Sequence, residues 1–529
     1  MVERVSKLKG YQYRKCDCPL DSMIPLKHRD PGKFKRQLIL YSFLVGLVSG
    51  GFSILYRWTL NHIEPVRHWL YQDSSWQRIG LLIGMAVAIS WILHQLLTWA
   101  PFSGGSGIPQ IKAELMNELD DRPFPTLVSK YIGGTLNALL GYSVGREGPS
   151  IQMGGMAAKL LSRHQKLDAM QTKYLTTAGA SAGLSAAFNA PLAGLLFALE
   201  EMYGSMSHIV VLPCIIASIV ANSLSYSLLG FEPSFSFRIT QHLPTKHIPM
   251  FILLGIFCGL VGVLFNQGRK FARTTVDRYH IPRLPLIILT SLLVIIMGYV
   301  LPGVQGGGHG LIESLTHEHF TLTSLCILLI AKLILTILCF NSGVQGGIFL
   351  PVLVLGALSG IIFQQVNFLG LASQGAISNY LILGMVGVLS SVVRAPILSI
   401  ILVTEMTGSL SHLLSLTIVA MVALFTADAL KCQPVYESLY RELIGRIRQD
   451  VYIEKESMVI SDFNMTEATA IVDIPLNTIP KEVEFLIIEI QRDQHHFIPT
   501  AKDTIQVFDR ISILHHPRDT EHIHQLFKT

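Results

Sequence analysis

Residues 145–149 read Gly-Arg-Glu-Gly-Pro, a motif in which a single acid lies between two glycines. The motif has the form Gly-x-x-x-Pro and runs directly into a helix-like segment. Proline suits the first turn of a helix, where its missing N–H is not needed, and glycine lets the backbone turn tightly and another group approach. Two more copies stand at residues 105–109 (Gly-Ser-Gly-Ile-Pro) and 347–351 (Gly-Ile-Phe-Leu-Pro).

The copies at 145–149 and 347–351 belong to a longer internal repeat. In both, a glycine follows the motif proline by five residues. Farther on, an Ala-Pro pair is followed nine residues after its proline by a glutamate. We therefore expect two related halves, near residues 37–230 and 248–430, an organisation typical of secondary transporters. The matched pairs are Gly154 with Gly356, Pro191 with Pro396, and Glu200 with Glu405.

The composition indicates a membrane protein. Of 529 residues, 50% are hydrophobic and 15% charged, whereas an average soluble domain has about 25% charged residues. This excludes an ordinary cytosolic enzyme and a disordered chain. Several apolar stretches between residues 37 and 430 reach the length of ~20 residues that spans a bilayer, and others are broken by Gly and Pro. Broken helices at membrane depth line cavities or are buried in protein, so the pattern favours a transporter or channel.

Charge divides the chain into a basic body and an acidic tail. Residues 1–449 carry 34 basic and 22 acidic side chains, and residues 450–529 carry 7 and 14. Ten Lys or Arg in the first 36 residues predict a cytoplasmic N-terminus by the positive-inside rule. We expect both termini to be cytoplasmic. The expected parts are a cytoplasmic segment over 1–36, a transmembrane domain over 37–448, a linker over 449–468 and a small cytosolic α/β domain over 469–529.

Three helix starts can together bind an anion. Each exposes unpaired N–H groups and the positive end of the helix dipole. Such dipoles hold an anion weakly enough for it to leave, whereas a full positive charge would retain it. We therefore predict transport of a small inorganic anion. Ser106 adds a hydroxyl donor at the first start, although a helix N-cap explains a serine there equally well.

Glu147 is the most informative single residue of the motifs. A carboxylate among dipoles arranged for an anion competes with that anion, so it can gate the path and carry a proton. The alternatives are a local pair with Arg146 or a surface loop position. Glu200 and Glu201 end an apolar run, where an interfacial position is the alternative to a functional one. Glu405, the repeat counterpart of Glu200, has the same two interpretations.

Together these residues resemble the CLC family of chloride channels and proton-coupled chloride antiporters. The resemblance covers roughly residues 35–448. It rests on the three Gly-x-x-x-Pro motifs, the Ala187–Gly194 stretch with Glu200-Glu201-Met202 after it, and Tyr436 after Pro434. It implies an all-α multipass fold of tilted and broken helices in two inverted-topology repeats. It also implies a homodimer with a separate anion path in each subunit.

The resemblance assigns roles residue by residue. The hydroxyls of Ser106 and Tyr436 would hold a central chloride, beside the backbone N–H groups of Ile348 and Phe349. The backbone N–H groups around Arg146, Glu147 and Gly148 would form an outer site once the Glu147 side chain swings away. Glu147 would be the external gating glutamate and Glu201 the internal proton-transfer glutamate, with Glu200 beside it. Leu192, Leu199 and Leu413 fall at the family's dimer contact, where the alternative is a lipid-facing position.

Glu201 favours a proton-coupled chloride antiporter of a prokaryotic plasma membrane, because passive channels of the family typically lack this acid. The alternative is a passive voltage- or ligand-gated chloride channel on the same fold. The Ser-bearing first motif favours chloride over fluoride, with nitrate or bromide also permeant. Bacterial relatives commonly have an acid where Gln110 stands.

A membrane enzyme is disfavoured, since no catalytic constellation, metal signature or P-loop is found. We expect no required cofactor and no nucleic-acid partner.

The tail resembles the RCK-C (TrkA-C) subdomain of potassium-transport regulators. Its short apolar runs, Phe485–Ile490 and Arg510–Leu514, predict strands, and residues 519–528 predict a short helix. Phe508 stands where that family usually has glycine. Such subdomains dimerise, and some bind cyclic di-AMP, so a regulatory nucleotide is our hypothesis; a dimer brace without ligand is the alternative. We interpret the His pairs of the tail as surface groups. The Cys16-x-Cys18 pair is a weak metal signal, and the Gly-rich stretch 303–310 is interpreted as a flexible connection.

Overall fold

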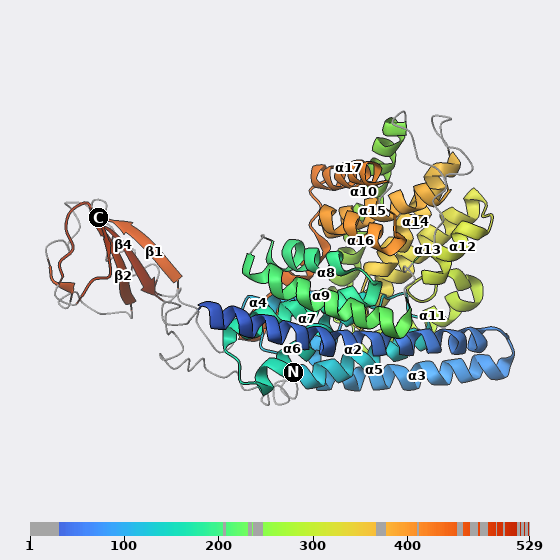
Figure 1. Cartoon of the computed structure of the whole chain (residues 1–529), viewed down its shortest axis with the longest axis horizontal. Coiled ribbons are helices and arrows are strands. Elements are labelled where there is room, and N and C mark those ends of the chain that lie inside the picture. Colours follow the sequence, from blue (N-terminus) through green and yellow to red (C-terminus); the bar gives the residue numbers. More distant parts are fainter. Residues whose placement is uncertain are drawn as a thin grey trace. The chain divides into compact units, whose positions relative to one another are not determined.

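The computed structural model (Figure 1) describes residues 31–451 except 205–207, 231–234, 236–246, 367–376 and 410–411. Farther on it describes 459–465, 474–476, 485–492, 495–500, 503–515 and positions 519, 523 and 527. Cys16 and Cys18, most of the predicted cytoplasmic segment, half of the predicted linker and most of the predicted helix at 519–528 lie outside the described residues. The chain divides into two compact units, Met1–Arg441 and Glu442–Thr529.

The first unit is a body of packed helices. Many begin with proline in the first turn, as the sequence predicts. Several helices are too short to span a membrane alone. The elements are α2 (Pro31–Tyr71), α3 (Trp76–Trp99), η3 (Pro101–Ser103), α4 (Ile108–Leu115), α5 (Pro123–Leu140), α6 (Glu147–His164), α7 (Ala169–Phe188), α8 (Pro191–Leu196), η4 (Phe197–Tyr203), α9 (His208–Leu229), α10 (Ile248–Arg278), α11 (Arg283–Val300), η6 (Pro302–Val304), α12 (His309–His317), α13 (Leu322–Asn341), α14 (Phe349–Val366), α15 (Ile377–Val393), α16 (Pro396–Thr407), α17 (Leu413–Ala429) and α18 (Val435–Val451).

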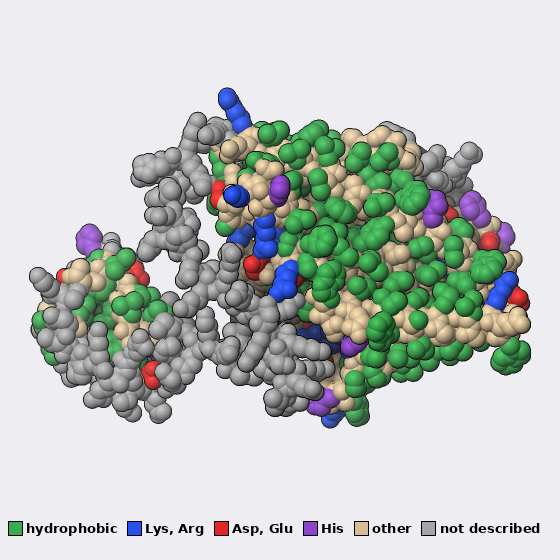
Figure 2. All heavy atoms as spheres, turned by 90° about the horizontal axis from the view of Figure 1, so that it is seen from below, with side chains coloured by type: hydrophobic (Ala, Val, Ile, Leu, Met, Phe, Trp, Pro, Cys, Tyr) green, Lys and Arg blue, Asp and Glu red, His purple; other side chains and the backbone are tan. Residues whose placement is uncertain are grey.

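The outside of this unit is apolar, as a lipid-facing surface must be. Within the part of the chain that the structure describes, 7 helices are long and apolar enough to cross a membrane. Figure 2 shows hydrophobic side chains spread over the visible face of the unit, with charged groups mainly near its ends. Large apolar side chains such as Trp91, Leu289 and Phe425 are more than half exposed. The predicted multipass membrane fold is confirmed.

Each half contains one closely packed helix pair that depends on glycine. In the pair α6–α7, Gly154 lies against the carbonyl oxygen of Gly179. In the pair α14–α15, Gly356 lies against the carbonyl oxygen of Gly384. A Cβ at Gly154 or Gly356 would overlap backbone of the facing helix. Small residues allow such close approach of helices in membranes, which explains why glycine recurs at this position of the repeat.

A buried lysine holds a loop in each half. Lys130 of α5 donates to the carbonyl oxygens of Ser103 (2.9 Å) and Gly105 (2.6 Å). Lys332 of α13 donates to those of Val304 (2.9 Å) and Gly306 (2.8 Å). Both lysines are fully buried, and both loops lead into a short helix, α4 or α12.

The Gly-rich stretch 303–310 therefore runs from η6 through a short loop held by Lys332 into α12, and its prediction as a flexible connection is wrong. Gly306 and Gly308 have φ values of 63° and 95°, close to the 64° and 89° of Gly105 and Gly107. Only glycine takes such left-handed conformations readily. The stretch is thus the second-half counterpart of the first motif. Its lack of the motif proline hid this relation from sequence analysis.

The tail contains a four-stranded antiparallel sheet of order β1-β4-β2-β3. Its strands are β1 (Val459–Asn464), β2 (Phe485–Arg492), β3 (His495–Phe497) and β4 (Arg510–His515). The two strands predicted from apolar runs are confirmed as β2 and β4. Phe508 has a φ of 71° and is 83% exposed. The turn before Asp509 therefore keeps the left-handed conformation that glycine would favour.

Replacing Gly154 with alanine should destabilise the membrane unit, because the new Cβ has no room against Gly179. We expect a loss of about 1–3 kcal/mol, as for other overpacked core positions. Gly80→Ala is the matched control: Gly80 is also in a helix, and no neighbouring atom lies within 4 Å of a Cβ built there. Thermal unfolding of the purified variants in detergent measures both. Equal melting temperatures for the two variants would contradict this account of the helix pair.

Candidate functional site

The three Gly-x-x-x-Pro segments meet in one place, joined by backbone hydrogen bonds. The N–H of Gly105 donates to the carbonyl of Val344 (2.9 Å), and the N–H of Gly346 donates to the carbonyl of Gly105 (3.0 Å). Gly145 and Gly347 donate to each other's carbonyls at 2.7 and 2.8 Å. We call this junction the glycine knot. The predicted convergence of the motifs is thus present in the structure.

Three helices begin beside the knot. They are α4, which follows Ser106, α6, which starts at Glu147, and α14, which starts at Phe349. A Cβ built on Gly148 would lie 2.6 Å from the Ser106 carbonyl oxygen and 3.1 Å from the Gly347 Cα. The first turn of α6 is therefore in contact with both other segments. Ile348 and Phe349, which open α14, are each only 1% exposed.

Two hydroxyls belong to the buried surroundings of the knot. The Ser106 Oγ accepts the Ile108 N–H at 3.3 Å, while Gly107 occupies the N-cap position of α4. This contact uses a lone pair of Ser106 and leaves its O–H free to donate. The Tyr436 hydroxyl, in the first turn of α18, is buried and has no hydrogen-bond partner among the described residues. A buried donor without a partner is costly, so the Tyr436 hydroxyl is a candidate ligand contact.

Glu147 is completely buried at the start of α6, so its alternative placement in a surface loop is wrong. Its Oε1 lies 3.9 Å from the Nε of Arg146, the longest ion pair in the described part of the body. Neither carboxylate oxygen has a hydrogen bond of good geometry there. The backbone N–H groups of Glu147 itself and of Leu350 are the nearest donors that face it. The carboxylate therefore occupies a region of converging backbone dipoles.

Glu201 lies on a helical segment of unusual form. The segment η4 is a π-helical turn, and Glu201 on it is only 8% exposed. Single π turns inside α-helices often occur at functional sites. Lys112, Glu200 and Glu437 are the charged groups near enough to act on Glu201 electrostatically. Both Glu147 and Glu201 act electrostatically on Tyr436, so the tyrosine lies within electrostatic range of both acids.

Glu200 and Glu405 form a reciprocal clamp between the two halves. The carboxylate of Glu200 accepts the N–H of Leu398 at 2.7 Å, at the start of α16. The carboxylate of Glu405 accepts the N–H groups of Leu192 (3.0 Å) and Ala193 (2.8 Å), at the start of α8. Each acid therefore caps the helix of the other half, where a negative charge is favourable. The sequence repeat pairs these glutamates, but it does not record that each caps the helix of the other half.

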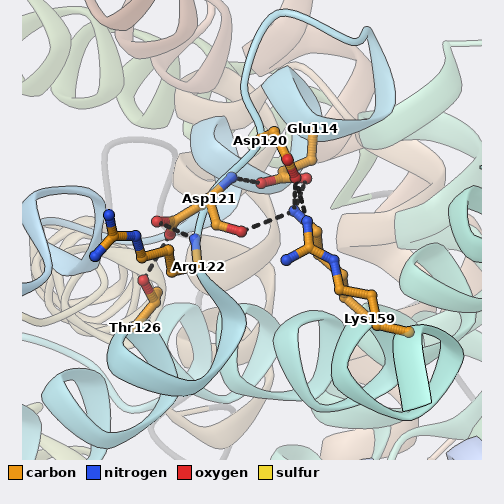
Figure 3. A network of polar contacts seen from close by, with 7 residues as sticks. Glu114, Asp120, Asp121, Arg122, Thr126 and Lys159 are labelled. Atoms are coloured by element: carbon orange, nitrogen blue, oxygen red, sulfur yellow. Dashed lines mark hydrogen bonds and ion pairs between the residues drawn. The ribbon is translucent and has the colours of Figure 1, made fainter. Parts of the chain in front are cut away.

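A charged network secures the ends of α4 and α6 that lie away from the knot (Figure 3). Lys159 of α6 is paired with Glu114 of α4 and donates to Asp120 (2.8 Å) and to the carbonyl of Asp121 (3.0 Å). The Asp121 side chain in turn accepts the hydroxyl of Thr126 at 2.6 Å. Both α4 and α6 are thus held at each end, which fixes the separation of Ser106 and Glu147.

The three leucines predicted at a dimer contact differ in exposure. Leu192 is 50% and Leu413 43% exposed, whereas Leu199 is 5% exposed and packs within its own chain. Leu192 and Leu413 therefore lie on the surface, where a subunit contact and a lipid-facing position both stay possible, and Leu199 does not. Gln110 has a local contact, since its side-chain amide donates to the Gly104 carbonyl at 3.0 Å. In the described residues no group of three His, Cys, Asp or Glu could hold a metal ion.

Fold and site together define a multipass membrane protein with a buried cluster of helix starts, free hydroxyls and acids. The family described as voltage gated chloride channel matches residues 84–428, and the chain belongs to this family. The H(+)/Cl(-) exchange transporter ClcA of Vibrio campbellii is 30% identical over 456 residues, which cover 83% of this chain and 97% of that relative. ClcA of Vibrio cholerae is 32% identical over 420 residues, 76% of this chain and 88% of the relative.

Solved structures agree with the sequence relatives. A slow cyanobacterial Cl−/H+ antiporter superposes with a TM-score of 0.71 at 28% identity, covering 77% of this chain and 98% of its own. A eukaryotic CLC transporter gives a TM-score of 0.66 at 20% identity, covering 78% and 74%, and supports the fold alone. The resemblance of the body to the CLC family is confirmed.

Substituting either glutamate of the clamp should destabilise the fold to a similar degree. In Glu405→Gln and Glu200→Gln an uncharged amide replaces the capping carboxylate, and one of its two oxygens is lost as an acceptor. A hydrogen bond to a charged group contributes about 1.5–3 kcal/mol, so each variant should melt at a lower temperature than the parent. Glu64→Gln, at a 46%-exposed site paired with Arg67, should melt like the parent. A much larger loss for only one clamp variant would argue against a reciprocal role.

Proposed function

We propose that the protein exchanges chloride for protons across a prokaryotic plasma membrane. The observation that carries the proposal is the fully buried, poorly satisfied carboxylate of Glu147 at the glycine knot, beside an unpaired Tyr436 hydroxyl. The names of the two sequence relatives described above, both H(+)/Cl(-) exchange transporters, support it. In this proposal the protein is a transporter and not an enzyme, chloride is its substrate, and no cofactor is required.

Chloride would be held by dipoles and hydroxyls. The O–H groups of Ser106 and Tyr436 would donate to a central chloride, beside the backbone N–H groups of Ile348 and Phe349. No lysine or arginine side chain is among these groups. Binding by partial charges in a buried site is strong enough to replace hydration and weak enough to release the ion.

Glu147 would couple chloride to protons at the outer end of the path. When ionised, its carboxylate competes with chloride for the backbone N–H groups around Arg146, Glu147 and Gly148. When protonated, it loses this attraction and leaves the outer site to chloride. The side chain therefore alternates with the anion, and it carries a proton each time it leaves the dipoles.

Glu201 would deliver protons from the inner side. It is buried and has Lys112, Glu200 and Glu437 as charged neighbours. A buried ionisable group in a membrane segment is a functional candidate by its energetic cost alone. Glu200 was also predicted to take part in proton transfer. That role remains a prediction, and its capping of α16 is an additional contact that such a role would have to accommodate.

The alternative function is a passive voltage- or ligand-gated chloride channel on the same fold. In a channel, chloride would cross without any proton movement, and Glu201 would be structural. The buried position of Glu201 near Tyr436 favours exchange, because an acid without a transport role would be costly at this depth. The exchange experiment below separates the two functions.

The proposal includes a homodimer with both termini in the cytoplasm. Exposed Leu192 and Leu413 would contribute to the subunit contact, with Leu199 packed inside each subunit. Light scattering of the detergent-solubilised protein measures the mass, and a monomer would contradict this part.

The RCK-C-like interpretation of residues 469–529 adds a regulatory nucleotide, with cyclic di-AMP as the candidate. Calorimetric titration of the full chain with cyclic di-AMP tests it, and absence of heat would remove the nucleotide from the proposal.

A chloride gradient should drive protons uphill through the wild-type protein in liposomes whose potential is clamped with valinomycin and potassium. Glu147→Ala and Glu201→Gln should retain chloride flux and lose proton movement, because each removes one proton carrier. Glu313→Gln is the control, since Glu313 is an exposed acid paired with His309 on α12, and it should behave like wild type. A pH electrode and a chloride electrode record both ions together.

Two results would contradict the proposal in different ways. Chloride flux without any proton movement in the wild type would establish the channel alternative. Proton coupling that survives in Glu201→Gln would leave exchange in place and remove Glu201 from the route.

A further inference from the structure

The helices that follow or contain the two hydroxyls, α4 and α18, are connected by side chains away from the glycine knot. Lys112 of α4 forms an ion pair with Glu437 of α18 at 3.3 Å between Nζ and Oε2. The hydroxyl of Tyr440, one turn farther along α18, donates to Glu118 at 2.7 Å, just beyond the end of α4. The Lys112 ammonium also lies 5.6 Å from the centre of the Tyr440 ring. The side chains of four residues thus connect the α4 segment to α18 in one group of contacts: Lys112, Glu118, Glu437 and Tyr440.

The position of these contacts relates them to the path. Lys112 lies six residues after Ser106, and Glu437 directly follows Tyr436. Both charges also act on Glu201. The contacts therefore lie close in sequence to Ser106 and Tyr436 and within electrostatic range of Glu201. They are partly open to solvent, since the side chains of Lys112 and Glu437 are 18% and 31% exposed.

Glu437 has a second cation available. Arg441, one turn later on α18, donates to its other carboxylate oxygen at 2.9 Å. If Lys112 moves away, Glu437 stays paired with Arg441 within its own helix. The losses are then one partly exposed ion pair, the contact of Lys112 with the Tyr440 ring and, once α18 moves, the hydrogen bond from Tyr440 to Glu118. Such pairs are weak, so α4 and α18 can separate at this level without leaving a buried charge unpaired.

We infer that the Lys112–Glu437 ion pair and the Glu118–Tyr440 hydrogen bond form a latch that closes the inner end of the path. Opening of the latch would widen the gap between the Ser106 and Tyr436 hydroxyls for chloride and admit water to Glu201. Lys112 and Glu437 are then positioning residues that set the rate of exchange, without contacting the transported ions in the closed form. This inference rests on the proposed exchange function.

Exchange kinetics of the full-length protein in liposomes test the latch. Lys112→Gln and Glu437→Gln should each raise kcat roughly two- to fivefold, the factor that a partly exposed ion pair is worth. The KM for chloride and the number of protons per chloride should stay unchanged. The charge swap Lys112→Glu with Glu437→Lys should return kcat toward wild type. Arg441→Gln is the matched control and should change little, because it leaves the Lys112 contact in place.

A covalent lock gives the opposite result. Cysteines at Lys112 and Glu437, joined by a short bismaleimide, should stop exchange, whereas the same double variant treated with a monofunctional maleimide should continue. Full activity of the joined protein, or unchanged kcat in both glutamine variants, would overturn the latch.

Hydrogen–deuterium exchange in detergent separates this inference from the proposed function, because it requires no transport. Peptides covering 108–115 and 435–441 should exchange faster in Lys112→Gln and Glu437→Gln than in wild type or Arg441→Gln. If wild type carries no chloride, the proposed function fails, and faster deuterium uptake in these peptides still supports the latch. Equal uptake in all four proteins would refute it.

Discussion

Backbone hydrogen bonds between glycine-containing loops hold the centre of this protein together. Gly105 pairs with Val344 and Gly346, and Gly145 pairs with Gly347, so three segments far apart in sequence meet without side chains between them. A Cβ at Gly148 would collide with the Ser106 carbonyl. The absence of side chains lets the starts of α4, α6 and α14 approach one another. Ser106 and Glu147 owe their positions to this junction, and Tyr436 on α18 is brought beside it.

The residues that support the junction occur in both halves of the repeat, whereas the candidate site residues occur in only one. Lys130 and Lys332 hold equivalent loops, Glu200 and Glu405 cap each other's helices, and Gly154 and Gly356 serve equivalent helix pairs. The candidate site positions differ between the halves. In the repeat register, Phe349 stands opposite Glu147, and Gly307 stands opposite Ser106. The duplicated residues therefore account for the shape of the body, whereas Ser106 and Glu147 of the candidate site have no counterpart of the same type in the second half.

The sequence predicted features that are encoded locally. The three Gly-x-x-x-Pro segments at 105–109, 145–149 and 347–351 each precede an apolar run, so the three helix starts, the repeat and the membrane class could be worked out before the structure. The partners of Lys130, the crossed capping by Glu200 and Glu405, and the latch between Lys112 and Glu437 are contacts between distant segments, which no local pattern records. The loop at 303–310 was misjudged because its glycines lack the neighbouring proline. Burial of Glu147 required packing from α14, which its own motif does not contain.

The π turn at Phe197–Tyr203 occurs in only one of the two equivalent helices. The matching helix, α16, is α-helical from Pro396 to Thr407, and Met406 stands where the first half has Glu201. A protein made of two equivalent halves has no built-in distinction between the two sides of the membrane. Widening one helix and placing an acid on it breaks that equivalence. The duplicated body is therefore asymmetric at this point, with a buried acid on the widened helix of one half and a methionine at the matching position of the other.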